Sequence, residues 1–523
     1  MRPEKTIREF VKPHFQCNRA LDVRKPKSPL YYFAIIDPVE SEPRLLFRSS
    51  PKRKVMVIGL DCADPELVFG RWLEDLPNIK RVLEAGVHGK LRSITPPITV
   101  PAWMCMMTSR DPGELGLYGF RNRSEYGYDK LSVANSASIH EETVWDILSG
   151  QRKDCIVIGV PPTYPVKALR GNLISCFLTP GSQSQFTYPH DLRPEVQRLV
   201  GDYMVDVKGF RTNKKQWLLS QIYEMTTKRF TVAKHLLKTR PWDFFMMVEM
   251  GTDRIHHGFW QFMDAKHVLY AGDGNPFRNA IHEYYKYVDT LVGELLEFAD
   301  ANTRVLIVSD HGAKRMDGAI ALNEWLVQKG YLTLKRYPSA PTRFEDLEID
   351  WGQTKAWGEG GYYGRICLNV AGREPQGSVA PHEYDGLRRR LKEELEALGD
   401  EQGRLIGTRV VLSEEAYKET RNIAPDLSVF FGDLYWRSSG MVGGGKIHSK
   451  ENDTGPDGAN HNWDGILLMA EGKDLAEGGP AGGPAVQGMR LYDVAPTILE
   501  AFKISRRPQM QGKAIQWPMA RAV

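Results

Sequence analysis

The sequence predicts an α/β fold, a doubly wound mixed sheet with helices on both faces. Two observations predict it: short apolar runs recur along the chain, and longer segments with helical periodicity separate them. We expect strands near residues 55–60, 155–160, 243–249, 304–309, 427–431 and 466–469. We expect helices from Asn78 to Ala85, where Gly86 is the stop signal, from Lys215 to Lys238, and from Ala280 to Ala299.

The composition is that of a globular protein. Of the 523 residues, 42% are hydrophobic and 26% are charged. No apolar run approaches the roughly 18 residues of a membrane span, and the first residues lack the apolar segment of a secretory signal. The six cysteines are scattered without paired spacing, which favours reduced thiols. We therefore expect a cytoplasmic protein without a membrane span.

The charge divides the chain into a basic, proline-punctuated N-terminal arm, residues 1–53, and a main domain, residues 54–523. Lys and Arg outnumber Asp and Glu in the arm, whereas the remainder is mildly acidic. The arm is interpreted either as an extended segment that wraps the domain or a second copy of the chain, as in a homo-oligomer, or as a solvated tail. Nucleic-acid binding is not favoured, because no recognised binding motif accompanies the charge.

Two metal-capable side chains, Asp310 and His311, directly follow the apolar run 305–309. A buried strand that ends in such residues places them at the carboxyl edge of a sheet, where open α/β folds bind ligands. Asp61 ends the apolar run 55–60 in the same way. Either aspartate alone would more often be an ordinary turn residue.

Two further sets complete a metal site. Asp253 and His257 follow the apolar run 244–248, and their i, i+4 spacing places both on one face of a helix. His461 lies just before the apolar run 466–469. Carboxylate and imidazole ligands together suit zinc, with manganese as the alternative.

In this order along the chain, the motifs resemble those of the alkaline phosphatase superfamily, specifically its type I phosphodiesterase and nucleotide pyrophosphatase family. The resemblance covers roughly residues 54–505. It implies that one metal ion is held by Asp253, His257 and His461. It implies that a second is held by Asp61, Asp310 and His311. The chain departs from the family at Glu114-Leu115-Gly116, where relatives usually have a histidine before the glycine.

The same resemblance makes Thr99 the nucleophile and a further ligand of the second metal. A threonine hydroxyl is a poor nucleophile at neutral pH, and a metal ion would activate it by lowering its pKa. Prolines on both sides would hold Thr99 on a stiff turn. Asn122 is the candidate amide donor to the phosphoryl group. The alternative is that Thr99 only caps the helix that Pro101 would begin.

Other motif residues have simpler interpretations. His256 is the less favoured ligand of its pair, because the i, i+4 partner of Asp253 is His257. His448 is interpreted as a surface loop histidine, with substrate contact as the alternative. Four tryptophans are interpreted as core packing: Trp103, Trp145, Trp260 and Trp325.

Cap or lid segments are expected around residues 330–458, with loops at 351–363 and 437–458 over the active site. Their aromatic residues would stack on a substrate ring: Trp351, Trp357, Tyr362, Tyr363, Tyr435 and Trp436.

The prediction is a two-metal hydrolase of a small phosphodiester or nucleotide substrate, acting through a phosphothreonine. The alternatives are a phosphomonoesterase, a phosphonate or sugar-phosphate hydrolase and, more remotely, a catalytically silent binding protein. Sulfatase activity is disfavoured, because those relatives need a cysteine or serine where this chain has Thr99.

Overall fold

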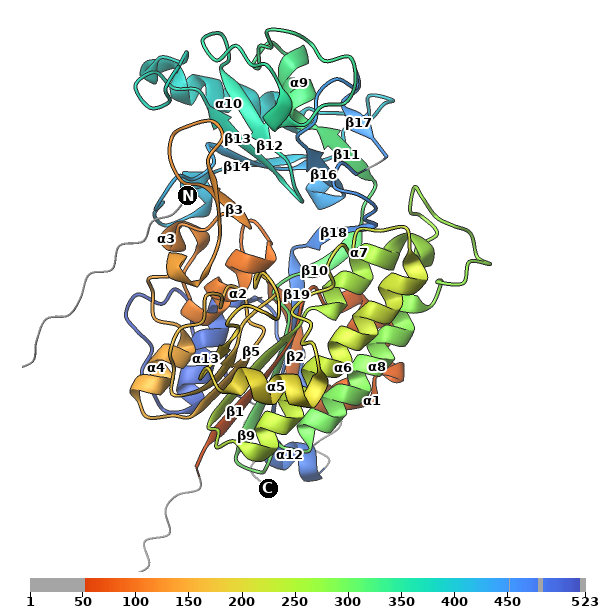
Figure 1. The fold of residues 1–523 in the computed structure, drawn as a ribbon, viewed down its shortest axis with the longest axis vertical. Helices are drawn as coiled ribbons and strands as arrows, with labels where there is room; N and C mark the ends of the chain where they lie inside the picture. The colour runs from red at the N-terminus through yellow and green to blue at the C-terminus, as the bar shows by residue number, and fades with distance from the viewer. Residues whose placement is uncertain (1–51, 451, 478–482, 518–523) are drawn as a thin grey trace, which may run out of the picture. The chain divides into compact units, whose positions relative to one another are not determined.

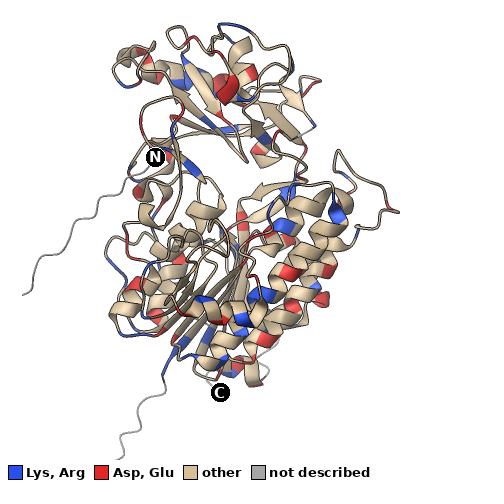
Figure 2. Ribbon diagram, in the orientation of Figure 1, with Lys and Arg blue, Asp and Glu red and all other residues tan. Residues whose placement is uncertain are grey.

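The computed structural model describes residues 52–450, 452–477 and 483–517, so nearly all of the predicted N-terminal arm lies outside the described residues. Within these ranges, no helix is both long and apolar enough to cross a membrane. Charged side chains lie mainly on helices and loops, whereas the strands of the central sheet carry few of them (Figure 2).

The central sheet has nine strands in the order β20-β2-β19-β9-β1-β8-β5-β6-β7. From β9 to β6 all neighbours are parallel, and β19 runs antiparallel to both β9 and β2. The sheet is therefore mixed, as predicted. Its strands are β1 (Lys54–Leu60), β2 (Val87–Arg92), β5 (Cys155–Ile158), β6 (Gly171–Ile174), β7 (Thr187–Tyr188), β8 (Phe244–Glu249), β9 (Thr303–Val308), β19 (Asp464–Glu471) and β20 (Met489–Arg490).

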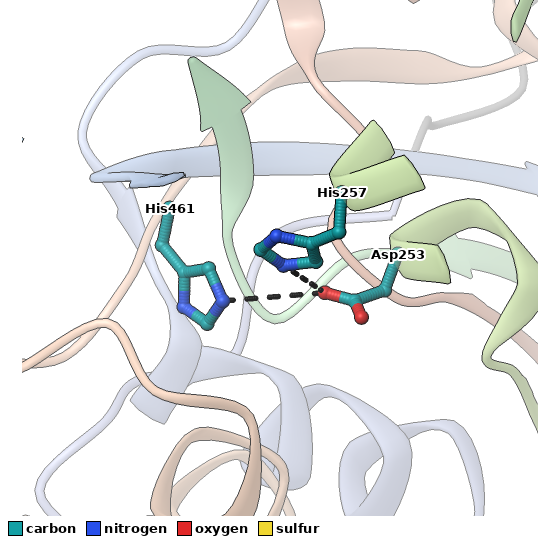
Figure 3. Close-up of side chains that lie close together, drawn as sticks. All are labelled: Asp253, His257 and His461. Atoms are coloured by element: carbon teal, nitrogen blue, oxygen red, sulfur yellow. Dashed lines mark ion pairs between the residues drawn. The ribbon is translucent and has the colours of Figure 1, made fainter. Parts of the chain in front are cut away.

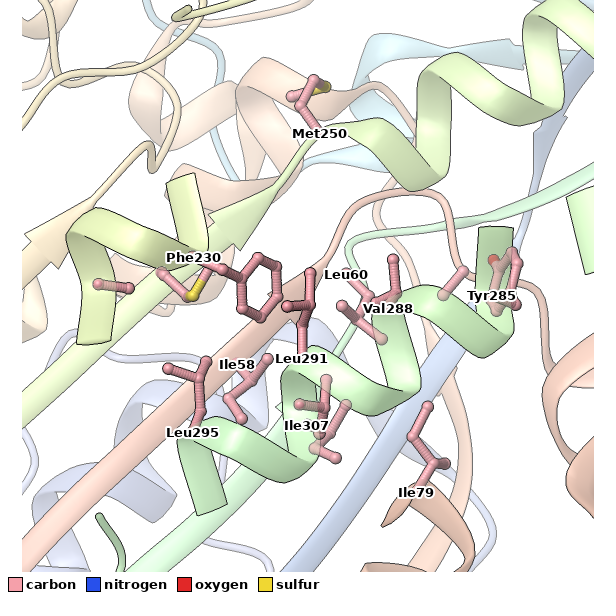
Figure 4. Close-up of a cluster of buried hydrophobic side chains, with 14 of the residues drawn as sticks. Ile58, Leu60, Ile79, Phe230, Met250, Tyr285, Val288, Leu291, Leu295 and Ile307 are labelled. Carbon is pink, nitrogen blue, oxygen red and sulfur yellow. The ribbon is translucent and has the colours of Figure 1, made fainter. Parts of the chain in front are cut away.

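Helices cover both faces of this sheet (Figure 1), because alternate side chains of its strands point to opposite sides. Ile58 and Leu60 of β1 pack with Phe230 and Val288 of two helices on one face (Figure 4). Val57 packs on the other face. The first face carries α1 (Pro77–Ala85), α6 (Lys215–Thr239), α7 (Gly251–Met263) and α8 (Ala280–Leu296), and the second carries α2 (Thr99–Thr108), α4 (Val144–Gly150) and α13 (Val494–Ala501).

A small lobe, residues 318–449, has its own hydrophobic core. Its four-stranded antiparallel sheet has the order β12-β13-β15-β14, and a second sheet has the order β16-β11-β17. The elements are β11 (Gly318–Ala321), α9 (Leu322–Gln328), β12 (Ala356–Glu359), β13 (Gly364–Leu368), α10 (Tyr384–Glu396), β14 (Arg409–Leu412), β15 (Leu427–Phe430), β16 (Trp436–Ser439) and β17 (His448–Ser449).

The lobe corrects three predictions. The strand expected near 427–431 forms as β15, but it pairs with β13 and β14 rather than with the central sheet. The expected loop 351–363 contains β12, because Trp357 is buried in the core of the lobe. The expected loop 437–458 contains most of β16 and all of β17. The other predicted strands lie in the central sheet, and the helix expected to reach Ala299 ends at Leu296.

Candidate metal centre and active site

The predicted ligands meet at the carboxyl edge of the central sheet. Asp61 follows β1, and Asp310 with His311 follows the adjacent parallel strand β9. On the other side of β1, strand β8 leads directly into α7, which carries Asp253 and His257. His461 comes from β18 (Ala459–Asn462), which pairs with β10 (Gly312–Arg315) just after the Asp310 motif. The parallel strands β8, β1 and β9, with the antiparallel pair β10 and β18, thus bring together residues that are far apart in the sequence.

Two groups of side chains have the spacing of metal ligands. Asp253, His257 and His461 form the first group, the predicted one (Figure 3). Oδ1 of Asp253 lies 3.2 Å from Nε2 of His257 and 4.0 Å from Nε2 of His461. The second group is Asp61, Asp253 and His311. Asp310 lies beside it, since its Oδ2 is 3.2 Å from Nε2 of His311. Asp253 therefore lies between the two groups.

Four of these side chains share one feature: one polar atom is held from outside the centre, and another points to no partner in the described part of the chain. Among the described residues, four buried atoms of the cluster have no hydrogen-bond partner. They are Oδ1 of Asp61, Oδ2 of Asp310, Nε2 of His257 and Nε2 of His461. Buried polar atoms are normally satisfied, so convergent orphans indicate a missing ligand. The donor set suits divalent zinc or manganese.

The outer atoms of the histidines are fixed by oxygen acceptors. Nδ1 of His257 lies 2.7 Å from Oδ1 of Asp457, and Nδ1 of His461 lies 2.7 Å from the carbonyl of Pro97. Nδ1 of His311 lies 3.0 Å from the carbonyl of Gly312. Such partners fix the ring orientation and leave Nε2 as the ligand atom.

The aspartates are held from outside by N–H donors. The indole of Trp103 donates to Oδ2 of Asp61 at 2.7 Å. Trp103 reaches this position because Gly59 has no side chain, since a Cβ there would lie 2.6 Å from the indole ring. Trp103 is thus more than the core packing that the sequence suggested. The backbone N–H of Cys62 donates to Oδ1 of Asp310 at 3.2 Å.

The electrostatics of the centre favour a cation. Burial, and next the charge of Asp253, raise the pKa of Asp61 well above its usual value. Burial and the charge of Asp61 likewise raise the pKa of Asp310. Crowded buried carboxylates repel one another, and a divalent ion would relieve that repulsion. Burial lowers the pKa of His311 to about 4, which keeps its imidazole neutral and able to bind a metal.

His257 differs from the other histidines. Burial opposes its charged form, but Asp457 and Asp253 outweigh burial and raise its pKa to about 9. At neutral pH this imidazole is therefore protonated without a metal, and metal binding would displace the proton.

Thr99 is the first residue of α2, and its side chain is only 3% exposed. Its Oγ1 lies 3.2 Å from Nε2 of His311, next to the second ligand group. The residue that caps α2 is Ile98, without a side-chain hydrogen bond. The capping alternative for Thr99 therefore finds no support in this geometry.

Asn122 is not poised to meet a substrate. Its Oδ1 accepts from the backbone N–H of Tyr118 at 2.7 Å, and its Nδ2 donates to the carbonyl of Gly119 at 3.2 Å. The amide thus stabilises its own turn, and its predicted contact with a phosphoryl group stays a prediction. Glu114, the departure from the family pattern, caps the short helix α3 (Pro112–Leu115) with Asp111.

The two other histidines named in the sequence analysis, His256 and His448, lie outside the ligand groups. His256 is fully buried and stacks against Tyr285, and neither of its ring nitrogens has a partner among the described residues. His448 lies in β17, and its Nε2 is 2.9 Å from the carbonyl of Gly399 within the small lobe.

A cavity of about 450 Å³, the catalytic cavity, opens onto the centre and includes Thr99, Asp253 and His461 in its wall. Aromatic side chains form much of the remainder: Phe120, Phe177, Phe210, Tyr362 and Tyr363. Tyr362 comes from the small lobe, and its ring lies 4.2 Å from His461 and 4.9 Å from His257, centroid to centroid. Of the expected aromatic surface, only Tyr362 and Tyr363 line this cavity.

Five arginines also line the catalytic cavity, and four of them are paired with carboxylates. Arg211 lies 3.0 Å from Asp457, and Arg254 lies 2.8 Å from Asp206. The other two pairs are Arg365 with Glu359 at 2.6 Å and Arg437 with Asp453 at 3.2 Å. Arg121, the fifth, has no ion-pair partner among the described residues. Sequence reasoning missed Asp457, because its contacts with His257 and Arg211 span 200 residues or more and leave no local signal. It also missed four of the arginines, because the direction of a side chain cannot be read from the sequence.

A doubly wound sheet with an acid–imidazole cluster and a buried threonine at its carboxyl edge has the parts of a phosphoric ester hydrolase. The profile of the type I phosphodiesterase / nucleotide pyrophosphatase family matches residues 55–460, and the chain belongs to this family. It is therefore a phosphodiesterase-type hydrolase.

Similar solved structures include murine ectonucleotide pyrophosphatase / phosphodiesterase 5, at 12% identity and a TM-score of 0.49, over 87% of this chain and 96% of the murine chain. The human protein of the same name gives 13% identity and a TM-score of 0.49, over 88% of this chain and 97% of the human chain. No curated protein matches the sequence.

Proposed function

We propose that the protein hydrolyses phosphodiester or nucleotide-type substrates with two metal ions and a covalent phosphothreonine at Thr99. The observation that carries the proposal is the convergence of buried, unpartnered ligand atoms beside the Thr99 hydroxyl. Asp253, His257 and His461 would hold one ion. Asp61, Asp310, His311 and Thr99 would hold the other. Zinc is the proposed metal and manganese the alternative.

Bound there, two divalent ions would lower the pKa of the Thr99 hydroxyl and offset charge on the phosphoryl oxygens. The chain supplies the remainder. Thr99 Oγ forms the bond to phosphorus, the alcohol leaves, and water then cleaves the threonine ester. The start of α2 fixes the direction of the hydroxyl, and the small lobe limits access of water.

The charge balance of the catalytic cavity supports a diester. A monoester dianion would need unpaired cations, but four of the five arginines in the wall already neutralise carboxylates. A diester carries one charge and a second organic group, which the aromatic wall suits. Arg121, the unpaired arginine, favours the second candidate: a phosphomonoesterase, or a phosphonate or sugar-phosphate hydrolase of the same superfamily.

A direct comparison of substrates tests the choice. The p-nitrophenyl ester of thymidine monophosphate should be turned over with higher kcat/KM than p-nitrophenyl phosphate, across a pH series. Replacing the free cation by Arg121→Gln should lower any residual monoesterase activity more than the diesterase activity. A consistent preference for the monoester would establish the second candidate instead.

The cellular location and assembly are proposals as well. We propose a cytoplasmic protein with reduced thiols, supported by the burial of Cys62, Cys105, Cys155, Cys176 and Cys367, which are unpaired. Cys17 and the arm that would mediate oligomerisation lie outside the described residues.

A further inference from the structure

A second cavity, of about 630 Å³, adjoins the catalytic cavity. Its volume is in the range of small-molecule sites. The two cavities share six lining residues: Arg121, Gly360, Gly361, Arg365, Arg437 and Thr454. At Gly361, one of these residues, an added Cβ would meet only the carbonyl of Tyr363, at 3.7 Å. The two cavities therefore share one boundary, and a molecule bound at Thr99 in the catalytic cavity lies next to the second cavity.

Three arginines line the boundary between the cavities, and two of them are paired with carboxylates. Arg437 is only 3% exposed, and its Nε is buried without a partner among the described residues. Its Nη1 donates to Oγ1 of Thr454 at 3.1 Å, and its Nη2 lies 3.2 Å from Asp453. Arg121 and Arg365 line the same boundary. Arg365 is paired with Glu359, so among the described residues the free charge at the boundary is that of Arg121. With the unpartnered N–H of Arg437 beside it, this charge suits one anionic group, and phosphate above all.

The far wall of the second cavity is aromatic. Tyr128 and Trp351 stack with centroids 3.6 Å apart and planes at 8°. Trp357 meets Trp351 edge to face at 5.3 Å, and Phe344 meets it at 6.3 Å. Trp357 is buried in the core of the lobe and packs against Trp351. Tyr128, Phe344 and Trp351 are half-buried, and their rings line the cavity. These three rings suit a flat ring system, on which they can stack.

We propose that the second cavity binds the leaving half of the substrate. This half is a planar aromatic group that is joined to the reacting phosphorus through a second phosphoryl group, and Arg121, the boundary arginine without an ion-pair partner among the described residues, holds that phosphoryl group. The inference rests on the proposed function and adds to it a subsite on the leaving-group side.

The reaction balances without another reactant. Thr99 Oγ forms a bond to the first phosphorus and loses its proton to solvent. The bond from that phosphorus to the bridging oxygen breaks, and the oxygen leaves with the second phosphoryl group and its ring. Water then hydrolyses the threonine ester.

Filling the second cavity tests the proposal. Gly440 lines this cavity and does not line the catalytic one. A Cβ at Gly440 would make only ordinary contacts, at 3.7 Å to the N of Gly360 and 3.8 Å to Nδ2 of Asn323, and its φ is not positive. Gly440→Phe therefore adds a ring without backbone strain, and Gly440→Ala is the matched control. Met441→Trp is a second filling variant in the same wall.

The probes are P1,P2-diadenosine diphosphate and adenosine 5′-diphosphate methyl ester, which differ only in the leaving-side nucleoside. The wild type should favour the first by about tenfold in kcat/KM, the scale of one stacked base. Gly440→Phe and Met441→Trp should bring the ratio close to one, and Gly440→Ala should keep it. A ratio near one in the wild type, or one that both filling variants keep, would overturn the subsite. Failure of the proposed function looks different, because the wild type would then cleave neither probe.

Discussion

The carboxyl edge of the central sheet and the small lobe contribute different things to the active site. Each predicted metal ligand lies outside residues 318–449, at a strand end of the core or on β18. The lobe contributes walls: Tyr362, Arg365 and Arg437 in the catalytic cavity, and most of the second cavity. The difference indicates that the core determines whether a phosphate ester is cleaved and that the lobe determines which one.

The separation has one exception at Tyr362. Its ring lies against both histidines of the first ligand group, and its hydroxyl accepts from Arg211, which pairs with Asp457 behind His257. Tyr362 thus connects the lobe to the metal centre. The contrast between core and lobe is therefore best tested with substitutions at other residues.

The largest effect is expected at Thr99. Thr99→Ala removes the attacking oxygen and should lower kcat roughly 10³-fold or more for every ester tested, because removal of a nucleophile has effects of this size or larger. Thr99→Ser keeps the hydroxyl and should retain appreciable activity. Steady-state kinetics on several diesters measure both. Near-normal turnover by Thr99→Ala would mean that water attacks directly.

Loss of one ligand should come next in size. His461→Ala should reduce the bound metal from about two ions per chain to about one, since the first group has only three protein ligands. His448→Ala is the control, because that imidazole contacts Gly399 within the lobe. Elemental analysis and activity after extended dialysis against a chelator give the readout. Full activity in metal-free protein would disprove the metal assignment.

The sequence predicted that the candidate ligands would lie close together, and the reason is physical. Residues that end apolar strands, such as Asp61 and Asp310, are positioned by the sheet itself, and the spacing of Asp253 and His257 is fixed by one helix. The resemblance to the family, which rests on the order of these motifs along the chain, assigned them to one site. The groups that hold the ligands from behind were not predictable, because the partner of His257 lies 200 residues further along the chain.

The lobe was harder to predict because its strands are short. β12 has four residues, and its neighbours Trp351 and Tyr362 resemble loop aromatics in the sequence. Pairing with β13, and the burial of Trp357 in the lobe core, determine its conformation. The direction of Arg365 follows from that pairing, and the direction of Arg437 follows from the pairing of β16 with β11. Neither pairing leaves a local pattern in the sequence.

A smaller effect is expected behind the second ligand group. Trp103→Phe keeps most of the ring volume but removes the donor to Asp61, and should weaken metal binding by about tenfold. Trp145→Phe, in the same hydrophobic cluster, is the control for lost packing. Chelator titrations of the three proteins give the comparison. Equal metal affinities would show that Asp61 does not need this hydrogen bond. A change in substrate preference would show that the core also affects which ester is cleaved.

The smallest effect concerns stability in the core, away from the ligands. Lys215, at the start of α6, is buried beside Phe259 and Phe262, and burial lowers its pKa to about 8 although Asp457 opposes the shift. Below pH 8, Lys215 is charged in both states, but only the folded protein buries the charge. Lys215→Met should therefore raise the free energy of unfolding by about 1 to 3 kcal/mol at pH 7. Between pH 8 and the ordinary lysine pKa of 10.5, only the unfolded chain holds the proton. Rising pH therefore stabilises the wild type, and the advantage of the variant should shrink.

The neighbouring residue provides the control for Lys215. Lys214 is exposed, so Lys214→Met should change the free energy of unfolding little at either pH. Denaturant unfolding at pH 7 and pH 9.5 measures all three proteins. A gain for Lys215→Met that is equal at both pH values would show packing rather than charge burial as its cause. Because Lys215 lies in the core, its replacement should leave the ratio between the two adenosine diphosphate probes as it is in the wild type, which only changes in the lobe are expected to alter.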